Sequence, residues 1–190
     1  MRNLALLITF STTLLNLTAE EVFRAGAATS NVTPWLGVSM PGGFTDRRAT
    51  KIYDELYARC LVLDDGKTQL AIVVVDNCIL PRDLLDRAKL MAENATEIPA
   101  KHILISATHS HSGPAAMDIA QCKADPEYQS FLVRRIADGI RRAASNAAPA
   151  KIGWGFGEMP SQVFNRRWHM KEGGIIENPF GNKKDQVRMN

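Results

Sequence analysis

Two of the four histidines in the sequence stand two positions apart, in His109-Ser110-His111. In an extended segment, residues i and i+2 point to the same face, so we expect the two imidazole rings to converge. Two convergent imidazoles can bind one divalent cation, and zinc is the natural candidate because imidazole nitrogen is among its preferred ligands. The alternative is a pair of surface or hydrogen-bonded histidines, because so short a pattern also arises by chance.

The position of the histidine pair favours a ligand site. The pair follows the apolar segment 103–105, which we expect to be a buried strand. Ligand sites in α/β proteins gather at the carboxyl ends of strands. Gly113-Pro114 then predicts a turn that leaves the pair on an exposed rim. Neighbouring hydroxyls could orient the rings or bind a substrate, and they belong to Ser106, Thr108, Ser110 and Ser112.

Carboxylates are the other groups near this rim that could take part in chemistry. Asp76 follows the apolar run 70–75 and either shares the rim with His109 or caps the strand end. Asp118 is the second nearby acid. The metallo-β-lactamase pattern HxHxDH is excluded, because Gly113 and Pro114 occupy its Asp and His positions. The sequence also contains no GxSxG, P-loop or GxGxxG motif.

Five segments with apolar or small side chains predict the strands that position this rim. The turn signal Asp64-Asp65-Gly66 joins the second and third of them into a hairpin. The predicted strands span 23–31, 56–63, 69–75, 103–105 and 151–156. With two intervening helices, this order predicts an α/β fold with a mixed β-sheet and flanking helices.

Proline and aspartate mark where the two helices begin. Pro81 opens the first helix, which is expected to fade near Asn94. Asp125 and Pro126 suit the N-cap and first turn of the second and longer helix. Its expected apolar face is Phe131, Ile136, Ile140 and Ala144. We interpret its arginines as a solvated face rather than an anion site: Arg134, Arg135, Arg141 and Arg142.

Length and charge exclude several classes of protein. A complete (β/α)₈ barrel needs about 250 residues, and this chain has 190. A net charge of +3 gives no electrostatic reason to expect a nucleic-acid partner. The three cysteines have no tight metal-binding spacing. In an oxidising compartment, we expect Cys60 to pair with Cys78 if their strands are neighbours.

The N-terminus has the order of a secretory signal peptide. Arg2 precedes 14 residues without a charged side chain (4–17), and Ala19 offers a small residue for cleavage. An N-terminal core helix is the alternative. We therefore expect a signal peptide at 1–19, a secreted or periplasmic protein, and no transmembrane span in the mature chain. An α/β domain is expected over 20–160, and an irregular tail over 161–190.

Several segments, in the same order along the chain, resemble the N-terminal domain of the neutral/alkaline (non-lysosomal) ceramidase family. They are residues 25–28, 31–34, 56–59, 75–76 and 106–114. The most specific is the last, in which Thr108-His109-Ser110-His111-Ser112-Gly113-Pro114 follows an Ile/Leu strand. The resemblance spans roughly residues 24 to 170.

This resemblance implies a zinc-dependent amidase that splits ceramide or a related N-acyl lipid. It implies that His109 binds zinc and that His111 assists the substrate or catalysis. Asn165-Arg166 resembles an Asn-Arg pair of the family, which implies a catalytic role for Arg166, although the residues that follow depart from the family pattern. The family's other ligands (a His, a Glu and a Tyr) and its serine nucleophile lie further along a longer chain. His169 does not match that later histidine.

Three functional hypotheses therefore remain open. The chain is a zinc-dependent hydrolase, a catalytically incomplete N-terminal part of a larger catalytic domain, or a small metal-binding or surface-interaction protein without turnover. Metal analysis of the wild type and of His109→Ala tests whether the chain has the metal site. An amidase assay separates an enzyme from the other two.

Overall fold

The computed structural model describes residues 22–43 and 45–163 of the chain. The predicted signal peptide, Arg166 and His169 lie outside these residues, so their roles remain predictions. The chain divides into two units, of which the first ends at Lys151. In the described part of the second unit, residues 152–163, the only regular element is the short 3-10 helix η2 (Pro160–Gln162).

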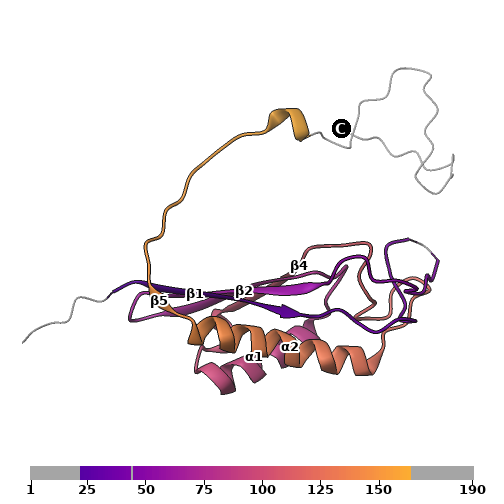
Figure 1. Ribbon diagram of the computed structural model, residues 1–190, viewed down its shortest axis with the longest axis horizontal. Coiled ribbons are helices and arrows are strands. Elements are labelled where there is room, and N and C mark those ends of the chain that lie inside the picture. Colours follow the sequence, from indigo (N-terminus) through magenta and orange to yellow (C-terminus); the bar gives the residue numbers. More distant parts are fainter. Residues whose placement is uncertain (1–21, 44, 164–190) are drawn as a thin grey trace, which may run out of the picture. The chain divides into compact units, whose positions relative to one another are not determined.

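A five-stranded sheet and two helices form the first unit (Figure 1). The strand order is β4-β3-β2-β1-β5. Strands β3 and β4 are parallel, and the other neighbours are antiparallel. The elements are β1 (Arg24–Asn31), β2 (Tyr57–Asp64), β3 (Gln69–Val75), α1 (Arg82–Thr96), η1 (Ala100–His102), β4 (Ile103–Ala107), α2 (Pro126–Ser145) and β5 (Ala148–Pro149). The predicted α/β fold with a mixed sheet is confirmed.

Local sequence signals account for the ends of several elements. The Asp125 carboxylate accepts hydrogen bonds from the backbone N–H groups of Glu127 and Tyr128, and Pro126 begins α2, as predicted. The hairpin between β2 and β3 turns through Gly66, whose φ of 88° is unfavourable for a residue with a side chain. These capping and turn residues set where the strands and helices start.

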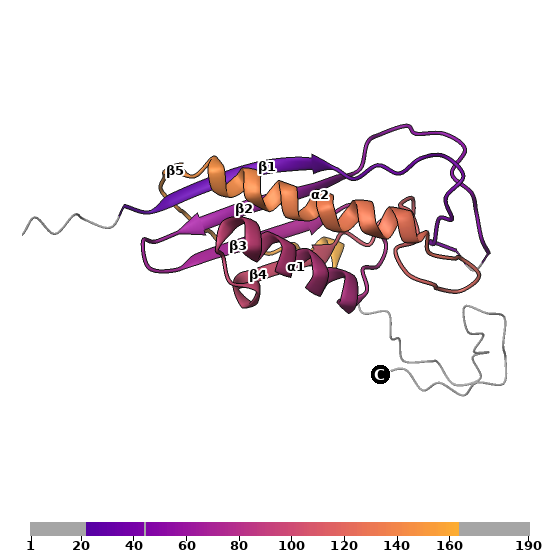
Figure 2. The same ribbon diagram turned by 90° about the horizontal axis from the view of Figure 1, so that it is seen from below.

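Both helices cover the same face of the sheet (Figure 2). Alternate strand residues point into this layer and are at most 3 % exposed: Ala58, Cys60, Val62, Ala71, Val73 and Val75. From α2, Leu132, Ile136 and Ile140 are fully buried against them. Ile136 and Ile140 were predicted on this face, whereas Phe131 and Ala144 are only partly buried at its border. In the described ranges, no helix is long and apolar enough to span a membrane.

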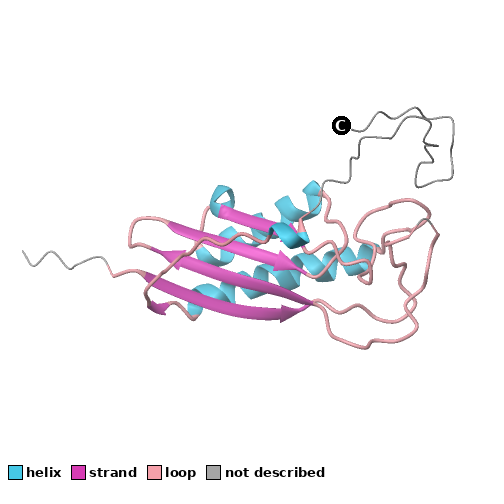
Figure 3. Ribbon diagram, turned by 90° about the horizontal axis from the view of Figure 1, so that it is seen from above, coloured by secondary structure: helices cyan, strands magenta, loops and turns pink. Residues whose placement is uncertain are grey.

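Figure 3 is drawn from the other side of the sheet. This face carries exposed apolar side chains. Leu61, Ile72 and Leu104 are in register across β2, β3 and β4. Their exposed fractions are 38 %, 38 % and 60 %. Strand alternation explains the arrangement, because the neighbours of these residues along each strand face the helices. The sheet is therefore apolar on both faces.

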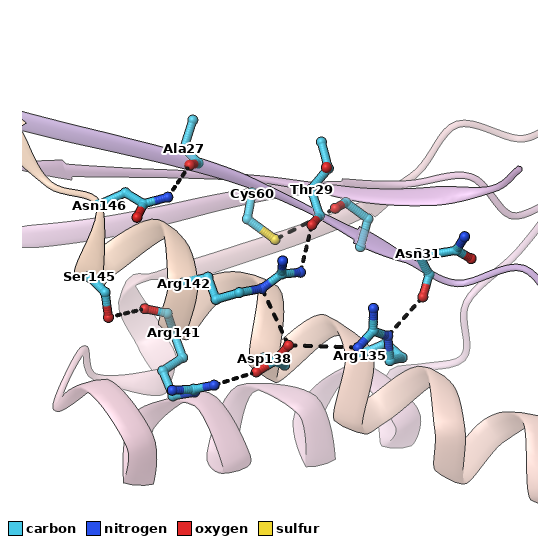
Figure 4. A network of polar contacts seen from close by, with 11 residues as sticks. Ala27, Thr29, Asn31, Cys60, Arg135, Asp138, Arg141, Arg142, Ser145 and Asn146 are labelled. Atoms are coloured by element: carbon cyan, nitrogen blue, oxygen red, sulfur yellow. Dashed lines mark hydrogen bonds and ion pairs between the residues drawn. The ribbon is translucent and has the colours of Figure 1, made fainter.

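Side chains of α2 and of the residue that caps its C-terminus, Asn146, donate hydrogen bonds to backbone carbonyls along the outer edge of β1 (Figure 4). Arg142 Nη2 donates to the carbonyl of Thr29 (2.6 Å), Arg135 Nε to that of Asn31 (2.8 Å), and Asn146 Nδ2 to that of Ala27 (3.0 Å). Strand β5 pairs with β1 only at Arg24 and Ala25. These contacts cover an edge that would otherwise be open to pairing. Arg135 and Arg142, predicted on a solvated face, remain partly exposed (34 % and 42 % of the side chain) and in addition bond to carbonyls of β1.

Two predictions about the chain are wrong. Cys60 and Cys78 form no disulfide, and the third cysteine, Cys122, is free as well. The strands are neighbours, but Cys60 pairs with Val73, five positions before Cys78. No strand spans 151–156, and Ile152 is exposed there. Glycine alternates through this segment and weakens a strand through its conformational entropy.

Candidate metal centre

The predicted rim lies where the parallel strands β3 and β4 end. After β4, the N–H of Thr108 donates to the carbonyl of Val75 (2.9 Å), and the N–H of Ser110 donates to that of Asn77 (3.1 Å). These two bonds continue the hydrogen-bond ladder between β3 and β4 beyond the ends of the two strands. They hold residues 108–110 beside residues 75–77, so the two strand ends together form the base of the site.

The two histidine rings converge as predicted, but the backbone that brings them together is not extended. His109 has φ of 62°, in the left-handed region that residues with a side chain seldom occupy. Its Nε2 lies 3.3 Å from Nε2 of His111, and the ring centroids are 4.9 Å apart. Strained backbone of this kind collects at functional sites, where surrounding contacts hold it in place.

A backbone carbonyl fixes the proton of His109. Nδ1 of His109 lies 2.9 Å from the carbonyl oxygen of Cys78. Because a carbonyl can only accept, Nδ1 of the neutral ring carries the hydrogen and Nε2 is left with a free lone pair. Metal-binding histidines commonly donate their other ring nitrogen in this way. His109 could therefore bind a cation through Nε2.

The spacing of the two Nε2 atoms fits a zinc ion. Two nitrogens bound to one tetrahedral zinc at about 2.05 Å are about 3.3 Å apart, and the observed separation is 3.3 Å. The same separation also fits a hydrogen bond between the two rings, which is the alternative that the sequence left open. Both histidines are exposed, so a further coordination position could open to solvent or substrate. The donor set suits zinc, although it does not identify the metal, because imidazole binds several transition metals.

Cys78 is a third potential ligand that the sequence did not indicate. One ligand atom from each of Cys78, His109 and His111 lies within 4.8 Å of the others. The Sγ atom of Cys78 lies 4.0 Å from Nδ1 of His109. Burial raises the pKa of the Cys78 thiol, so it remains protonated at neutral pH unless a metal displaces the proton. The signal that could have found it is its place just after β3, the parallel neighbour of β4.

A loop between β1 and β2 packs against His111. Arg47 Nη2 donates to the carbonyl of His111 (3.0 Å). Gly42 has φ of 149°, and a Cβ there would lie 2.6 Å from the Cβ of His111, closer than real Cβ atoms approach. The N–H of Ala115 also donates to the carbonyl of Ser39 (2.7 Å). Together these contacts determine where the His111 backbone lies.

The carboxylates considered from the sequence are engaged elsewhere. Asp76 accepts from the backbone N–H of Tyr57 (3.0 Å) and from Arg59 Nη1 (2.7 Å), so it caps the strand end. Asp118 forms an ion pair with Lys123 (2.6 Å), whose hydrogen bond lowers the pKa of Asp118. Neither carboxylate belongs to the Cys/His cluster found among the described residues.

A cavity of about 590 Å³ lies beside the histidine segment. Ser110 and Ser112 contribute to its wall, whereas the alternating His109 and His111 do not. Its apolar wall includes Trp35, Ile52 and Leu56. The cavity has the size and mixed lining typical of small-ligand sites. It adjoins the candidate metal centre through the serines and does not enclose it.

Comparisons with known proteins find similarity in structure. No protein-family model matches the chain, and no curated protein matches it. The crystal structure of neutral ceramidase from Pseudomonas aeruginosa matches with a TM-score of 0.58 and 20 % identity, over 69 % of this chain and 23 % of that one. A ceramidase complexed with C2 matches with a TM-score of 0.55 and 18 % identity, over 67 % and 22 % of the two chains.

The first unit therefore has a ceramidase-like α/β fold. The chain spans less than a quarter of the length of either structure that it matches. At this level of identity the likeness concerns the fold, and the chemistry of the site has to be argued from the residues present here.

Proposed function

We propose that this chain is a zinc-dependent hydrolase of the neutral ceramidase type, which acts on the amide bond of ceramide or of a related N-acyl lipid. The observation that carries the proposal is the geometry of the histidine pair. Two Nε2 atoms lie 3.3 Å apart, and one ring is held in the ligand tautomer by the carbonyl of Cys78. The ceramidase-like fold and the Thr-His-Ser-His-Ser-Gly-Pro run at residues 108–114 support the same class.

Each residue has a defined part in the proposed site. His109 binds zinc through Nε2 and keeps its Nδ1 proton on the carbonyl of Cys78. The short separation supports a ligand role for His111 as well, beside the catalytic role that the family resemblance implies. When bound, zinc supplies Lewis-acid polarisation of a carbonyl oxygen. Arg166, which lies outside the described residues, is proposed to stabilise negative charge that develops on the substrate.

The cavity beside the site supports a lipid-like substrate. Its apolar side chains suit a hydrocarbon segment, and the hydroxyl of Ser112 can donate to a polar head. Because Ser112 follows His111 directly, a polar group that binds Ser112 would lie beside the segment that carries the histidine pair, although the two rings do not line the cavity. This arrangement agrees with an amide group that lies between an apolar chain and a polar head.

A second candidate is a metal-binding protein without turnover. It is favoured by the buried Cys78, because a thiolate added to two imidazoles makes a more closed ligand set than a catalytic site needs. A closed set of Cys and His ligands is typical of structural zinc.

Hydrolysis of a fluorogenic ceramide by the zinc-loaded protein distinguishes the two candidates. The comparison uses wild type, His109→Ala and His102→Ala. The last variant is a matched control. His102 directly precedes β4, at the end of the strand opposite to the rim, and its Nδ1 lies near the carbonyl of Gln69. Product release that is lost in His109→Ala and kept in His102→Ala supports the hydrolase. Zinc bound by the wild type without release in any form argues against turnover by this chain, and it agrees with the second candidate and with a catalytically incomplete part.

A further inference from the structure

The turn after β3 contacts the segment that carries the histidine pair. Its central residue, Asn77, has a fully buried polar side chain. Burying an amide costs free energy unless its polar atoms form hydrogen bonds. The side-chain hydrogen bond of Asn77 is made with Ile79 and not with one of the three candidate ligands. Asn77 therefore needs a reason to be where it is.

Two oxygen atoms of Asn77 organise the backbone around the site. Its side-chain Oδ1 accepts from the N–H of Ile79 (3.2 Å), which closes a tight turn around Cys78. Its main-chain carbonyl accepts from the N–H of Ser110 (3.1 Å), the residue between the two histidines. One residue thus ties the turn that presents the Cys78 carbonyl to the segment that carries both imidazoles.

The rest of the Asn77 side chain is packed tightly. The phenol of Tyr128, fully buried in α2, interacts with the Asn77 amide and donates its hydroxyl hydrogen to the carbonyl of Val32 (3.0 Å). Among the described residues, Nδ2 of Asn77 has no hydrogen bond of normal geometry. On the site side, a Cβ at Gly113 would lie 3.3 Å from the Asn77 Cα. Asn77 thus lies between the helix layer and the rim.

We infer that Asn77 is a positioning residue, which holds the Cys78 carbonyl against Nδ1 of His109 so that Nε2 of His109 faces His111. The inference rests on the metal site proposed above. Asn77 itself does not touch the metal, and its effect passes through the Cys78 carbonyl. Outer contacts of this kind commonly change metal affinity by about 10- to 100-fold.

The tautomer of His109 gives a direct test that needs no metal. Nitrogen-15 NMR of the metal-free full chain reports which ring nitrogen carries the hydrogen. The wild type is expected to show His109 protonated at Nδ1, because the Cys78 carbonyl accepts there. Asn77→Ala, which removes the Oδ1 contact with Ile79, is expected to show a mixture of the two tautomers. An unchanged tautomer in Asn77→Ala overturns the inference.

Zinc affinity provides the second readout, with a control for lost stability. Val62→Ala is a matched variant, because Val62 is buried in the same core and pairs with Ala71, far from the strand end that carries the site. Asn77→Asp keeps the Oδ1 acceptor and is therefore expected to retain the turn. It is the variant to compare with wild type if Asn77→Ala does not fold. We expect Asn77→Ala to bind zinc at least about 10-fold more weakly than Val62→Ala. Equal affinity of these two variants contradicts the inference.

The two readouts separate this inference from the proposed function. If the wild type binds no zinc, the proposed metal site fails, while the tautomer comparison still decides the role of Asn77. If the wild type binds zinc and Asn77→Ala behaves like Val62→Ala in both measurements, only the positioning role fails.

Discussion

Replacing Gly42 by alanine should disturb His111 more than it disturbs the fold. A Cβ at position 42 would lie 2.6 Å from the Cβ and 2.8 Å from the Cα of His111. Carbon atoms pack at about 3.5–4.0 Å, so the loop or the His111 backbone has to move by about 1 Å. Metal–ligand distances tolerate only about 0.2 Å. A shift of this size should therefore lower zinc affinity by about tenfold or more.

Backbone strain adds to the effect of Gly42→Ala. The φ of Gly42 is 149°, which a residue with a side chain adopts at a cost of about 1–3 kcal/mol. The loop can relieve the strain by moving away from His111, at the expense of the hydrogen bond from Arg47. The melting temperature should consequently fall by only a few degrees, while zinc affinity falls sharply.

Two glycines in the same loop provide matched controls. A Cβ at Gly43 would meet no atom within 4 Å, and Gly43 has no positive φ, so Gly43→Ala should change nothing. Gly37 has φ of 90° in open space, so Gly37→Ala adds strain without a collision. Chelator competition measures zinc affinity, and calorimetry measures thermal unfolding. The reasoning is refuted if Gly42→Ala binds zinc as tightly as Gly43→Ala does.

Two further predictions concern the fold. Burial raises the pKa of Cys60 to about 12 and also raises the pKa of the other two thiols, so none should react quickly with a disulfide reagent at pH 8 before unfolding. A fast-reacting thiol in the native protein would contradict this. The hydrogen bond from Arg141 lowers the pKa of Asp138 in the folded state. Asp138→Asn should therefore cost roughly 1 kcal/mol at pH 7. Urea unfolding should show the difference from wild type vanishing as the pH falls from the usual aspartate pKa of about 3.9 through the lowered folded-state pKa.

Local sequence patterns were sufficient for most of the fold and for the histidine pair. Asp125 and Pro126 set the start of α2 because capping depends on neighbouring residues in the chain. Likewise, the apolar strand before His109 places the pair at a strand end whatever the rest of the sheet does. The predicted strand at 151–156 failed because alternation alone does not supply a partner strand.

The parts of the site that were missed depend on contacts between distant segments. Cys78 comes near His109 because β3 and β4 are parallel neighbours. The sequence suggested that the two strand ends share a rim, but it did not show that the turn after β3 brings the Cys78 side chain beside His109. The contact of Gly42 with His111 joins residues 69 positions apart, through a loop with no regular pattern. The left-handed backbone of His109 is likewise imposed by its surroundings rather than by its residue type.

The most direct test of the central claim is a metal measurement on the purified protein. Elemental analysis after dialysis against zinc should give one zinc per chain for wild type and for His102→Ala. His109→Ala should retain none, because it lacks the Nε2 atom that lies 3.3 Å from that of His111. No zinc in the wild type, or equal zinc in His109→Ala, would contradict the account.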